Sequence, residues 1–419
     1  MRQSSIKSVL ILCPAAVGGA AEHVYYQACA LQELGVNVAI LCPTNYLENR
    51  SLDVDTLRWL PSGEVKARST SSSRSAGLIK CLNALRFFGR IVAAFWILSW
   101  QVVVRRPDAV LIASFLEYFS PFWVWPHLVL AKTGFVLYAA NLQDPVRNWR
   151  LGPKWWHRLS VRLAFAPLSA ALIHEFLPDK SVVPSHVLLA EAPVGIYELN
   201  HADVDATAVR DGWSLGKEQV VFLAFGFIRD NKNVDLLIRA LSRVPLASLA
   251  VVGRAQSSRN RPVQYYRDLA AELGVADRVR FSEEFVPDER LAGYFSAADV
   301  IAITYSKEFH SQSGVLNVAA RSRKLVLASS GEGPLKTAVT KFGLGKFVEP
   351  DDLDSMVAGM GQLCDEVKKH RGQAAAADKS QQQSEQPNYA AYELYASWRA
   401  NAAVLLEVLD KVRNARAKA

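Results

Sequence analysis

The sequence predicts an α/β protein with two Rossmann-like, doubly wound domains that face a cleft, followed by a C-terminal helix. Short apolar runs alternate with segments of helical spacing from residue 9 to residue 174, and a second alternation of the same kind begins near residue 219. The length of 419 residues fits two such domains. Because 50% of the residues are hydrophobic and 21% are charged, a largely disordered chain is excluded.

The first domain, predicted at residues 1–200, begins with a β-α-β unit. An apolar strand at 9–13 leads into a helix at 22–34, which Gly35 ends before a second strand at 36–42. This alternation predicts a parallel sheet covered by helices. Further strands are expected at 109–113, 134–139 and 170–174.

The second domain is predicted at residues 201–371 and is also doubly wound. After it, the Ala/Gln/Ser-rich segment 372–387 is expected to be a flexible linker. A C-terminal helix at 388–419 is expected to pack back towards the first domain. The predicted strands of the second domain are 220–225, 248–252, 278–281, 300–304, 325–328 and 345–348, with helices at 234–241, 262–273, 288–296, 316–321 and 352–367.

The formal net charge of +8 is concentrated in the first domain. Residues 51–165 contain 15 Lys or Arg against 6 Asp or Glu, together with eight of the ten tryptophans. A basic, tryptophan-rich region indicates an anionic partner or a membrane surface.

The five cysteines show neither C-x-x-C nor Cys/His metal spacing, so neither a disulfide framework nor a metal site is predicted. No signal-peptide pattern is seen, and we expect a cytoplasmic protein, either free or peripheral on the membrane.

Two helical segments, about 78–104 and 154–168, contain much of this tryptophan and arginine. Arg86 and Arg90 precede the apolar block 91–104, whose 14 residues fall short of the roughly 20 that a spanning helix needs. Two interpretations stay open. Both helices pack on the sheet with their arginines in water, or they lie in a membrane interface with tryptophan at headgroup depth and arginine on lipid phosphate.

Several loops that follow predicted strands carry glycine and cations. Gly18 and Gly19 allow a tight turn and a close approach of the backbone to a ligand, although the G-x-G-x-x-G pattern of NAD and FAD proteins is absent. In the second domain Gly226 allows the same kind of turn. Arg229 and Lys232 lie where the chain enters a helix, and two cations there would hold a diphosphate.

Two further loops of the second domain are candidate parts of the same site. Ser313 and Gly314 would place free N–H groups at a helix start, which suits phosphate. Glu308 could accept hydrogen bonds from sugar hydroxyls, and Gly331 lies in the next strand-to-helix loop. His310 is interpreted as a surface residue.

In the first domain Asp144 follows a predicted strand. It is a candidate general base or acceptor-binding carboxylate. Its place before Pro145 gives it an equally good explanation as a turn former.

The order of these motifs resembles the retaining GT-B glycosyltransferases of family 4, the glycosyl transferases group 1. Residues 14–23 read P-x-x-x-G-G-x-x-E-H, similar to the opening glycine loop of that family. Residues 225–240 resemble its f-G-x-I-R-x-x-K segment, and 285–300 its v-p-x-x-e-l…A-D segment. Residues 313–316 with Ala319 resemble a variant of its donor loop.

The resemblance implies sugar transfer, with retention, from a UDP- or GDP-linked donor and without a bound metal. The acceptor would be a carbohydrate or a lipid-linked sugar, and no nucleic acid is expected. By the resemblance, Arg229 and Lys232 hold the diphosphate, Gly19 faces the donor sugar and Glu308 contacts the sugar hydroxyls. The resemblance also assigns to the donor-binding loops Gly18, Gly226, Ser313, Gly314, Val315, Leu316 and Gly331.

The sequence departs from the family at one glutamate. The family has two glutamates eight positions apart, and here Glu308 is followed at that spacing by Leu316, while a gapless count back from the next strand pairs His310 with Val318. A catalytically inactive GT-B scaffold in polysaccharide or glycolipid assembly is therefore the alternative hypothesis.

Overall fold

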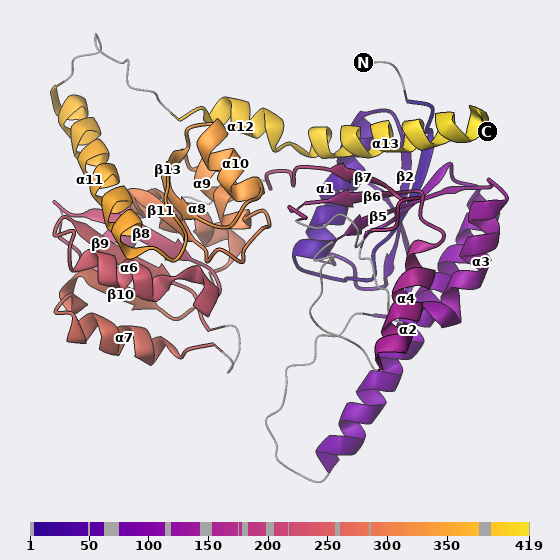
Figure 1. Cartoon of the computed structure of the whole chain (residues 1–419), viewed down its shortest axis with the longest axis horizontal. Coiled ribbons are helices and arrows are strands. Elements are labelled where there is room, and N and C mark those ends of the chain that lie inside the picture. The colour runs from indigo at the N-terminus through magenta and orange to yellow at the C-terminus, as the bar shows by residue number, and fades with distance from the viewer. Residues whose placement is uncertain are drawn as a thin grey trace. The chain divides into compact units, whose positions relative to one another are not determined.

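The computed structural model describes residues 4–48, 51–62, 75–113, 119–142, 153–174, 176–177, 183–197, 205–216, 218–255, 260–284, 286–376 and 387–418. The chain forms two compact units, each built on a parallel sheet (Figure 1). Unit 1 consists of Met1–Gly195 and Trp398–Ala419, and unit 2 of Ile196–Ser397.

Unit 1 contains a seven-stranded parallel sheet in the order β3-β2-β1-β4-β5-β6-β7. The order reverses between β1 and β4, and ligands of such sheets bind outside the carboxyl ends of the strands at this point. The edge strands β3 and β7 were not predicted, because neither has the continuous apolar run of the buried central strands. The strands are β1 (Ser8–Leu12), β2 (Asn37–Pro43), β3 (Asp55–Leu60), β4 (Ala109–Ile112), β5 (Leu137–Leu142), β6 (Ala170–Ile173) and β7 (Leu188–Glu191).

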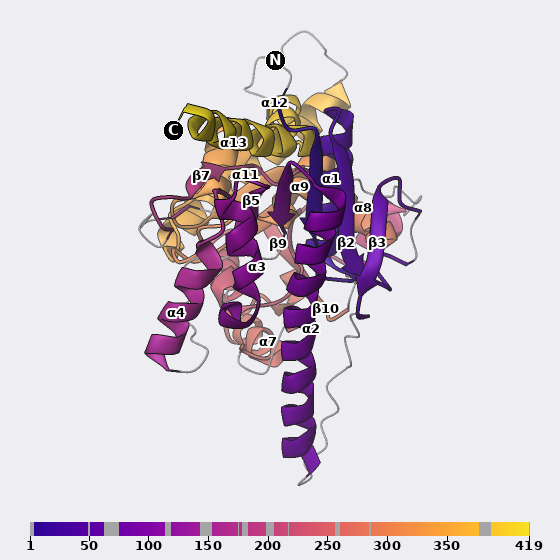
Figure 2. The ribbon, with the colours of Figure 1, turned by 90° about the vertical axis from the view of Figure 1, so that its right-hand side faces the viewer.

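The helices of unit 1 cover this sheet. Helix α2 buries Phe95 and Leu98 in the core, and the ring of Phe95 stacks on that of Trp123 in α3 with centroids 3.7 Å apart. Figure 2 shows the N-terminal half of α2 extending past the strands. The helices are α1 (Gly19–Glu33), α2 (Ser75–Arg105), α3 (Ser120–Lys132), α4 (Lys154–Phe165) and α13 (Trp398–Lys418).

Unit 2 contains a six-stranded parallel sheet in the order β10-β9-β8-β11-β12-β13, which reverses between β8 and β11. Its strands are β8 (Val220–Phe225), β9 (Ala247–Val252), β10 (Val279–Ser282), β11 (Val300–Thr304), β12 (Leu325–Ser329) and β13 (Gly345–Phe347). Its helices are α5 (Ala206–Trp213), α6 (Val234–Leu241), α7 (Val263–Glu272), α8 (Asp288–Ala297), α9 (Gly314–Arg321), α10 (Pro334–Lys341), α11 (Leu353–Ala376) and α12 (Tyr389–Tyr395), with 3-10 turns η2 (Asp230–Lys232) and η3 (Ala276–Arg278). Two doubly wound sheets of this kind confirm the predicted fold class.

The C-terminal segment differs from the single predicted helix. Helix α11 continues through Ala376, so the first residues of the predicted linker are helical, and 377–386 lie outside the described residues. Two helices follow, because their apolar faces belong to different cores. Tyr392 of α12 is buried in unit 2 and donates to Asn317 Oδ1 (2.7 Å), whereas α13 packs along α1 in unit 1.

Candidate donor site

Three loops of unit 2 leave the same edge of its sheet. Strands β8, β11 and β12 are neighbours and run parallel, so their carboxyl ends lie side by side. The loop after β8 contains Gly226, Arg229 and Lys232, the loop after β11 leads to Ser313, and the loop after β12 contains Gly331. The predicted donor-site residues of unit 2 are thus brought to one edge, at the reversal point of the sheet.

Glycines allow the loop after β8 to approach its neighbour. Gly226 has φ +90°, and its N–H donates to Val252 O at 2.9 Å. Gly253, at the end of β9, approaches so closely that a Cβ there would lie 2.1 Å from Gly226 O. Gly253 was not predicted, although its position directly after a buried strand was a signal in the sequence.

Lys232 is held at the end of β8. Its Nζ donates to Phe225 O at 2.6 Å, and its own carbonyl accepts from Thr304 Oγ1 at 3.0 Å, which ties the η2 turn to β11. Burial, and then the charge of Arg229, lower the pKa of Lys232 to about 8. The ammonium group is therefore desolvated and close to a second cation.

Arg229 is half-buried, and its Nε is buried without a hydrogen-bond partner in the described part of the chain. Neither Arg229 nor Lys232 forms an ion pair among the described residues. Two more polar atoms of these loops, Asn231 Oδ1 and Ser306 Oγ, are also buried and unpartnered, and Ser306 N donates to Asn231 O at 2.9 Å. An anionic, hydrogen-bonding ligand would satisfy such a site.

Helix α9 begins at Gly314, directly after the loop that follows β11. Its N-cap Ser313 is buried but makes no side-chain cap hydrogen bond, and Ser313 Oγ lies 3.4 Å from Tyr305 Oη. Gly314 is exposed with open space around it, and Val315 is half-buried. The Leu316 side chain is instead buried in the core, and its N–H donates to Ser313 O. The first turn thus offers the N–H groups of Gly314 and Val315.

The structure distinguishes Glu308 from His310. Glu308 is exposed on a turn, with no partner among the described residues. His310 is half-buried rather than at the surface, and its Nδ1 lies 2.8 Å from Glu332 O. A Cβ at Gly331 would lie 2.5 Å from His310 Cε1 and 2.1 Å from Lys307 O, so glycine is required where these two loops meet.

In unit 1 the glycine turn lies at the carboxyl end of β1. Gly18 has φ +84° and is the N-cap of α1, which starts at Gly19. A Cβ at either position would meet no atom within 4 Å, so this side of the turn is open. Asp144 lies outside the described residues, since β5 is followed to Leu142.

A buried polar network in unit 1 was not predicted. Asn141 Nδ2 donates to Gln27 Oε1 (3.0 Å), Gln27 Nε2 to Asn401 Oδ1 (2.7 Å), and Asn401 Nδ2 to Pro193 O (2.7 Å), which joins α1, β5 and α13. Polar side chains within otherwise apolar helices and strands were the feature of the sequence that could have indicated this network. Beside it, burial lowers the pKa of His23 to about 3. In the described residues no group of three His, Cys, Asp or Glu side chains could hold a metal.

The matches to known sequences fall largely on unit 2. Residues 219–366 match the family described as "Glycosyl transferases group 1". The D-inositol 3-phosphate glycosyltransferase of Mycobacteroides abscessus is 31% identical over 174 residues, which are 41% of this chain and 38% of that protein. That of Streptomyces griseus is 33% identical over 199 residues, 44% of this chain and 41% of that protein. The chain thus spans about two fifths of the length of these relatives.

Solved structures match over nearly the whole chain at low identity, which shows the fold. Sucrose-phosphate synthase from Thermosynechococcus elongatus has a TM-score of 0.63 at 16% identity, covering 98% of this chain and 100% of that chain. Anabaena HepE in complex with UDP and glucose has a TM-score of 0.59 at 14% identity, covering 99% of this chain and 100% of that chain. The chain has the GT-B fold, and its residues 219–366 match the glycosyl transferases group 1 family.

Proposed function

We propose that this chain is a glycosyltransferase that moves a sugar from a nucleoside diphosphate sugar to a carbohydrate or lipid-linked acceptor, with retention of configuration. The observation that carries the proposal is the pair Arg229 and Lys232 at the carboxyl end of β8. They are two desolvated cations without an acidic partner in the described residues, and one buried N–H of Arg229 is unused. A diphosphate supplies the missing charge and acceptors.

The donor in this proposal is UDP- or GDP-linked. The HepE structure with UDP-glucose, which shares the fold, favours UDP as the first nucleotide to try. The charge of the diphosphate would be balanced by Arg229, Lys232 and the N-terminus of α9, so we propose transfer that needs no added metal.

Cys13 and Cys364 are buried free thiols, as is usual in a reducing compartment, and we propose a cytoplasmic location.

In the proposed step the bond between the sugar C1 and the β-phosphate oxygen breaks while the acceptor oxygen forms a bond to C1 from the same face. The proton of the acceptor hydroxyl passes to the departing phosphate oxygen. Arg229 and Lys232 stabilise the charge that develops on the diphosphate. Because no motif supplies a protein nucleophile, we propose front-face transfer without a covalent intermediate. Asp144 is the proposed general base or acceptor-binding carboxylate.

Calorimetric titration with UDP, GDP, ADP and their sugar conjugates, without added metal, tests the donor site. We expect saturable binding of one nucleotide. Arg229→Ala or Lys232→Ala should weaken it about 10- to 150-fold, because each removes a charge-assisted hydrogen bond. Arg239→Ala is the matched control, since Arg239 is an exposed cation on α6. Wild-type affinity in the Arg229→Ala, Lys232→Ala double variant would contradict the assignment.

The inactive scaffold is the second candidate, and one observation favours it. Eight positions after Glu308 the chain has Leu316, whose side chain is buried in the core, so no carboxylate can face the nucleotide from there. A scaffold would bind the nucleotide sugar without consuming it. Binding of the donor with no release of nucleoside diphosphate, in the presence of cell-derived acceptors, would favour the scaffold over the enzyme.

A further inference from the structure

Helix α2 is apolar on two opposite faces. Its inner face, which includes Phe95 and Leu98, is part of the core of unit 1. Its outer face carries Trp96, Trp100 and Val103, all about half exposed and spaced by four and three residues, so they form one stripe. Residues Leu82–Arg105 are long and apolar enough to cross a bilayer. Because its inner face packs on the sheet, α2 lies against its domain rather than crossing a membrane.

The stripe continues onto α3 and α4. Trp96 Nε1 donates to Phe122 O of α3 at 3.1 Å, and the ring of Phe122 lies 6.0 Å from that of Trp156 in α4. Trp125 of α3 is 57% exposed and Trp155 of α4 is 64% exposed. We call these exposed apolar side chains of α2, α3 and α4 the aromatic surface; its members are Leu85, Trp96, Trp100, Phe122, Trp125 and Trp155.

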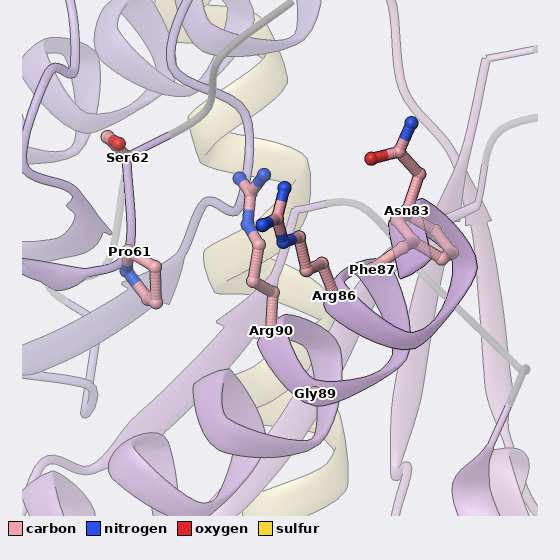
Figure 3. A pocket seen from close by; sticks show the side chains of 7 residues that line it. All are labelled: Pro61, Ser62, Asn83, Arg86, Phe87, Gly89 and Arg90. Carbon is pink, nitrogen blue, oxygen red and sulfur yellow. The ribbon is translucent and has the colours of Figure 1, made fainter. Parts of the chain in front are cut away.

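The charged residues of the three helices have one sign, although Arg105 pairs with Asp55 of β3 at 3.3 Å. Helices α2, α3 and α4 contain no Asp or Glu. Arg86 and Arg90, one helical turn apart, have no partner among the described residues. Figure 3 shows their guanidinium groups extending from the helix in the same direction, into a groove that Pro61 and Ser62 also line. The eight basic residues of the three helices are Lys80, Arg86, Arg90, Arg105, Lys132, Lys154, Arg158 and Arg162.

We propose that the aromatic surface binds the interface of an anionic phospholipid bilayer, with Arg86 and Arg90 on lipid phosphates. Tryptophan prefers the headgroup depth of a membrane, where its ring is desolvated and its N–H stays near water. A basic helix face attracts anionic lipid. The two interpretations from the sequence, packing on the sheet and location in a membrane interface, are therefore compatible. Each helix packs on the sheet through one face and offers the other face to lipid. This inference does not depend on sugar transfer.

A second copy of the chain suits this surface poorly. A two-fold dimer would place the same patch on both partners, so the basic residues of one copy would face those of the other with no acidic residue on α2, α3 or α4 to pair with. An anionic bilayer presents the complementary charge. The lipid is thus the occupant that the charge pattern favours.

Flotation with vesicles tests the proposal on the whole chain. The vesicles contain phosphatidylcholine alone or with 30 mol% phosphatidylglycerol, at low and high salt. We expect binding to the anionic vesicles that weakens with salt. Arg86→Gln with Arg90→Gln should weaken it about 25-fold, at roughly fivefold for each charge. Trp100→Ser with Trp125→Ser and Trp155→Ser should reduce binding to both kinds of vesicle.

Matched variants in unit 2 control for charge and apolar area. Arg239→Gln with Arg321→Gln removes two exposed arginines, and Leu394→Ser removes an exposed apolar side chain. Both should bind vesicles like the unchanged protein. Circular dichroism and thermal unfolding show whether each variant is folded, and nucleotide titration separates this proposal from the donor site in unit 2.

Three results would overturn the proposal. They are no binding to anionic vesicles at low salt, equal loss in the control variants, and a dimer in light scattering that the Trp100→Ser, Trp125→Ser, Trp155→Ser variant converts to a monomer. The last result would assign the aromatic surface to a second copy. Quenching of tryptophan fluorescence by lipids brominated near the headgroup, and not by lipids brominated at the chain end, would support interfacial depth.

Discussion

Lys232 shows at the scale of one residue what the sequence could predict. Its position after a strand of a doubly wound sheet predicts a ligand contact, because strand order places such loops at one edge. The desolvation of Lys232 by the loop fold could not be predicted, and neither could the contact of His310 with Gly331 and Glu332, since both depend on neighbours distant in sequence. The role of Glu308 stays a prediction.

The pKa of Lys232 makes donor binding depend on pH. In the free protein this pKa is about 8, so Lys232 is largely neutral at pH 8.5. A bound diphosphate favours the charged form and raises the pKa, so binding at pH 8.5 should take up as much as about three quarters of a proton. Calorimetry in two buffers of different ionisation enthalpy measures this uptake.

The matched variant for proton uptake is Lys232→Arg, whose guanidinium remains charged. It should bind the nucleotide with almost no proton uptake at pH 8.5. Equal uptake by both proteins would show that another group titrates and would contradict the role given to Lys232.

At the scale of elements, the central strands were predictable because burial on both faces requires continuous apolar runs. The edge strands β3 and β7 lack that pattern and depend on pairing with a neighbour. The C-terminal helices show a similar limit. Apolar spacing predicts helix from residue 389 onward, but the division into α12 and α13 follows from two separate cores.

Helix α13 is fixed to unit 1 through Asn401. This side chain accepts from Gln27 Nε2 and donates to Pro193 O, and it is fully buried. Asn401→Ala would leave both partners buried and unsatisfied, so the free energy of unfolding should fall by about 2–4 kcal/mol. Urea unfolding measures the change. Asn83→Ala, at an exposed position on α2, should change it by less than about 0.5 kcal/mol.

For the whole molecule, the two doubly wound units and their order along the chain follow from the sequence, because alternation of strand and helix prescribes them. The aromatic surface could be predicted from the sequence only in part. The clustering of tryptophan with arginine indicated a membrane, but periodicity alone could not say which tryptophans face the core. Trp123 is buried against Phe95, whereas Trp125, two residues later, is exposed.

Buried histidines should make the molecule sensitive to acid. Burial lowers the pKa of His23 to about 3 and that of His127 to about 4, from 6.5 for the free side chain. The unfolded chain therefore binds more protons below pH 6.5, and stability that is complete above this pH is lost as the pH falls towards 4. Each histidine should contribute a loss of about 1.4 kcal/mol per pH unit.

Urea unfolding between pH 7.5 and 5 measures this dependence. His127→Gln should lower the slope of unfolding free energy against pH by about 1.4 kcal/mol per pH unit below pH 6.5, which corresponds to one proton, because glutamine does not titrate. An unchanged slope would show that His127 is not buried in its neutral form, hydrogen-bonded to Tyr138 and Phe95 O.

We propose above that this chain breaks the bond between sugar and diphosphate with retention. NMR of the purified protein with the nucleotide sugar that it binds, followed from the first minutes, identifies the anomer released to water or to an added acceptor. From an α-linked donor we expect the α-anomer first, with release abolished in Arg229→Ala. A β-anomer formed first would contradict retention. Donor binding without any release of the sugar, with or without acceptor, would contradict the proposal that the chain is an enzyme.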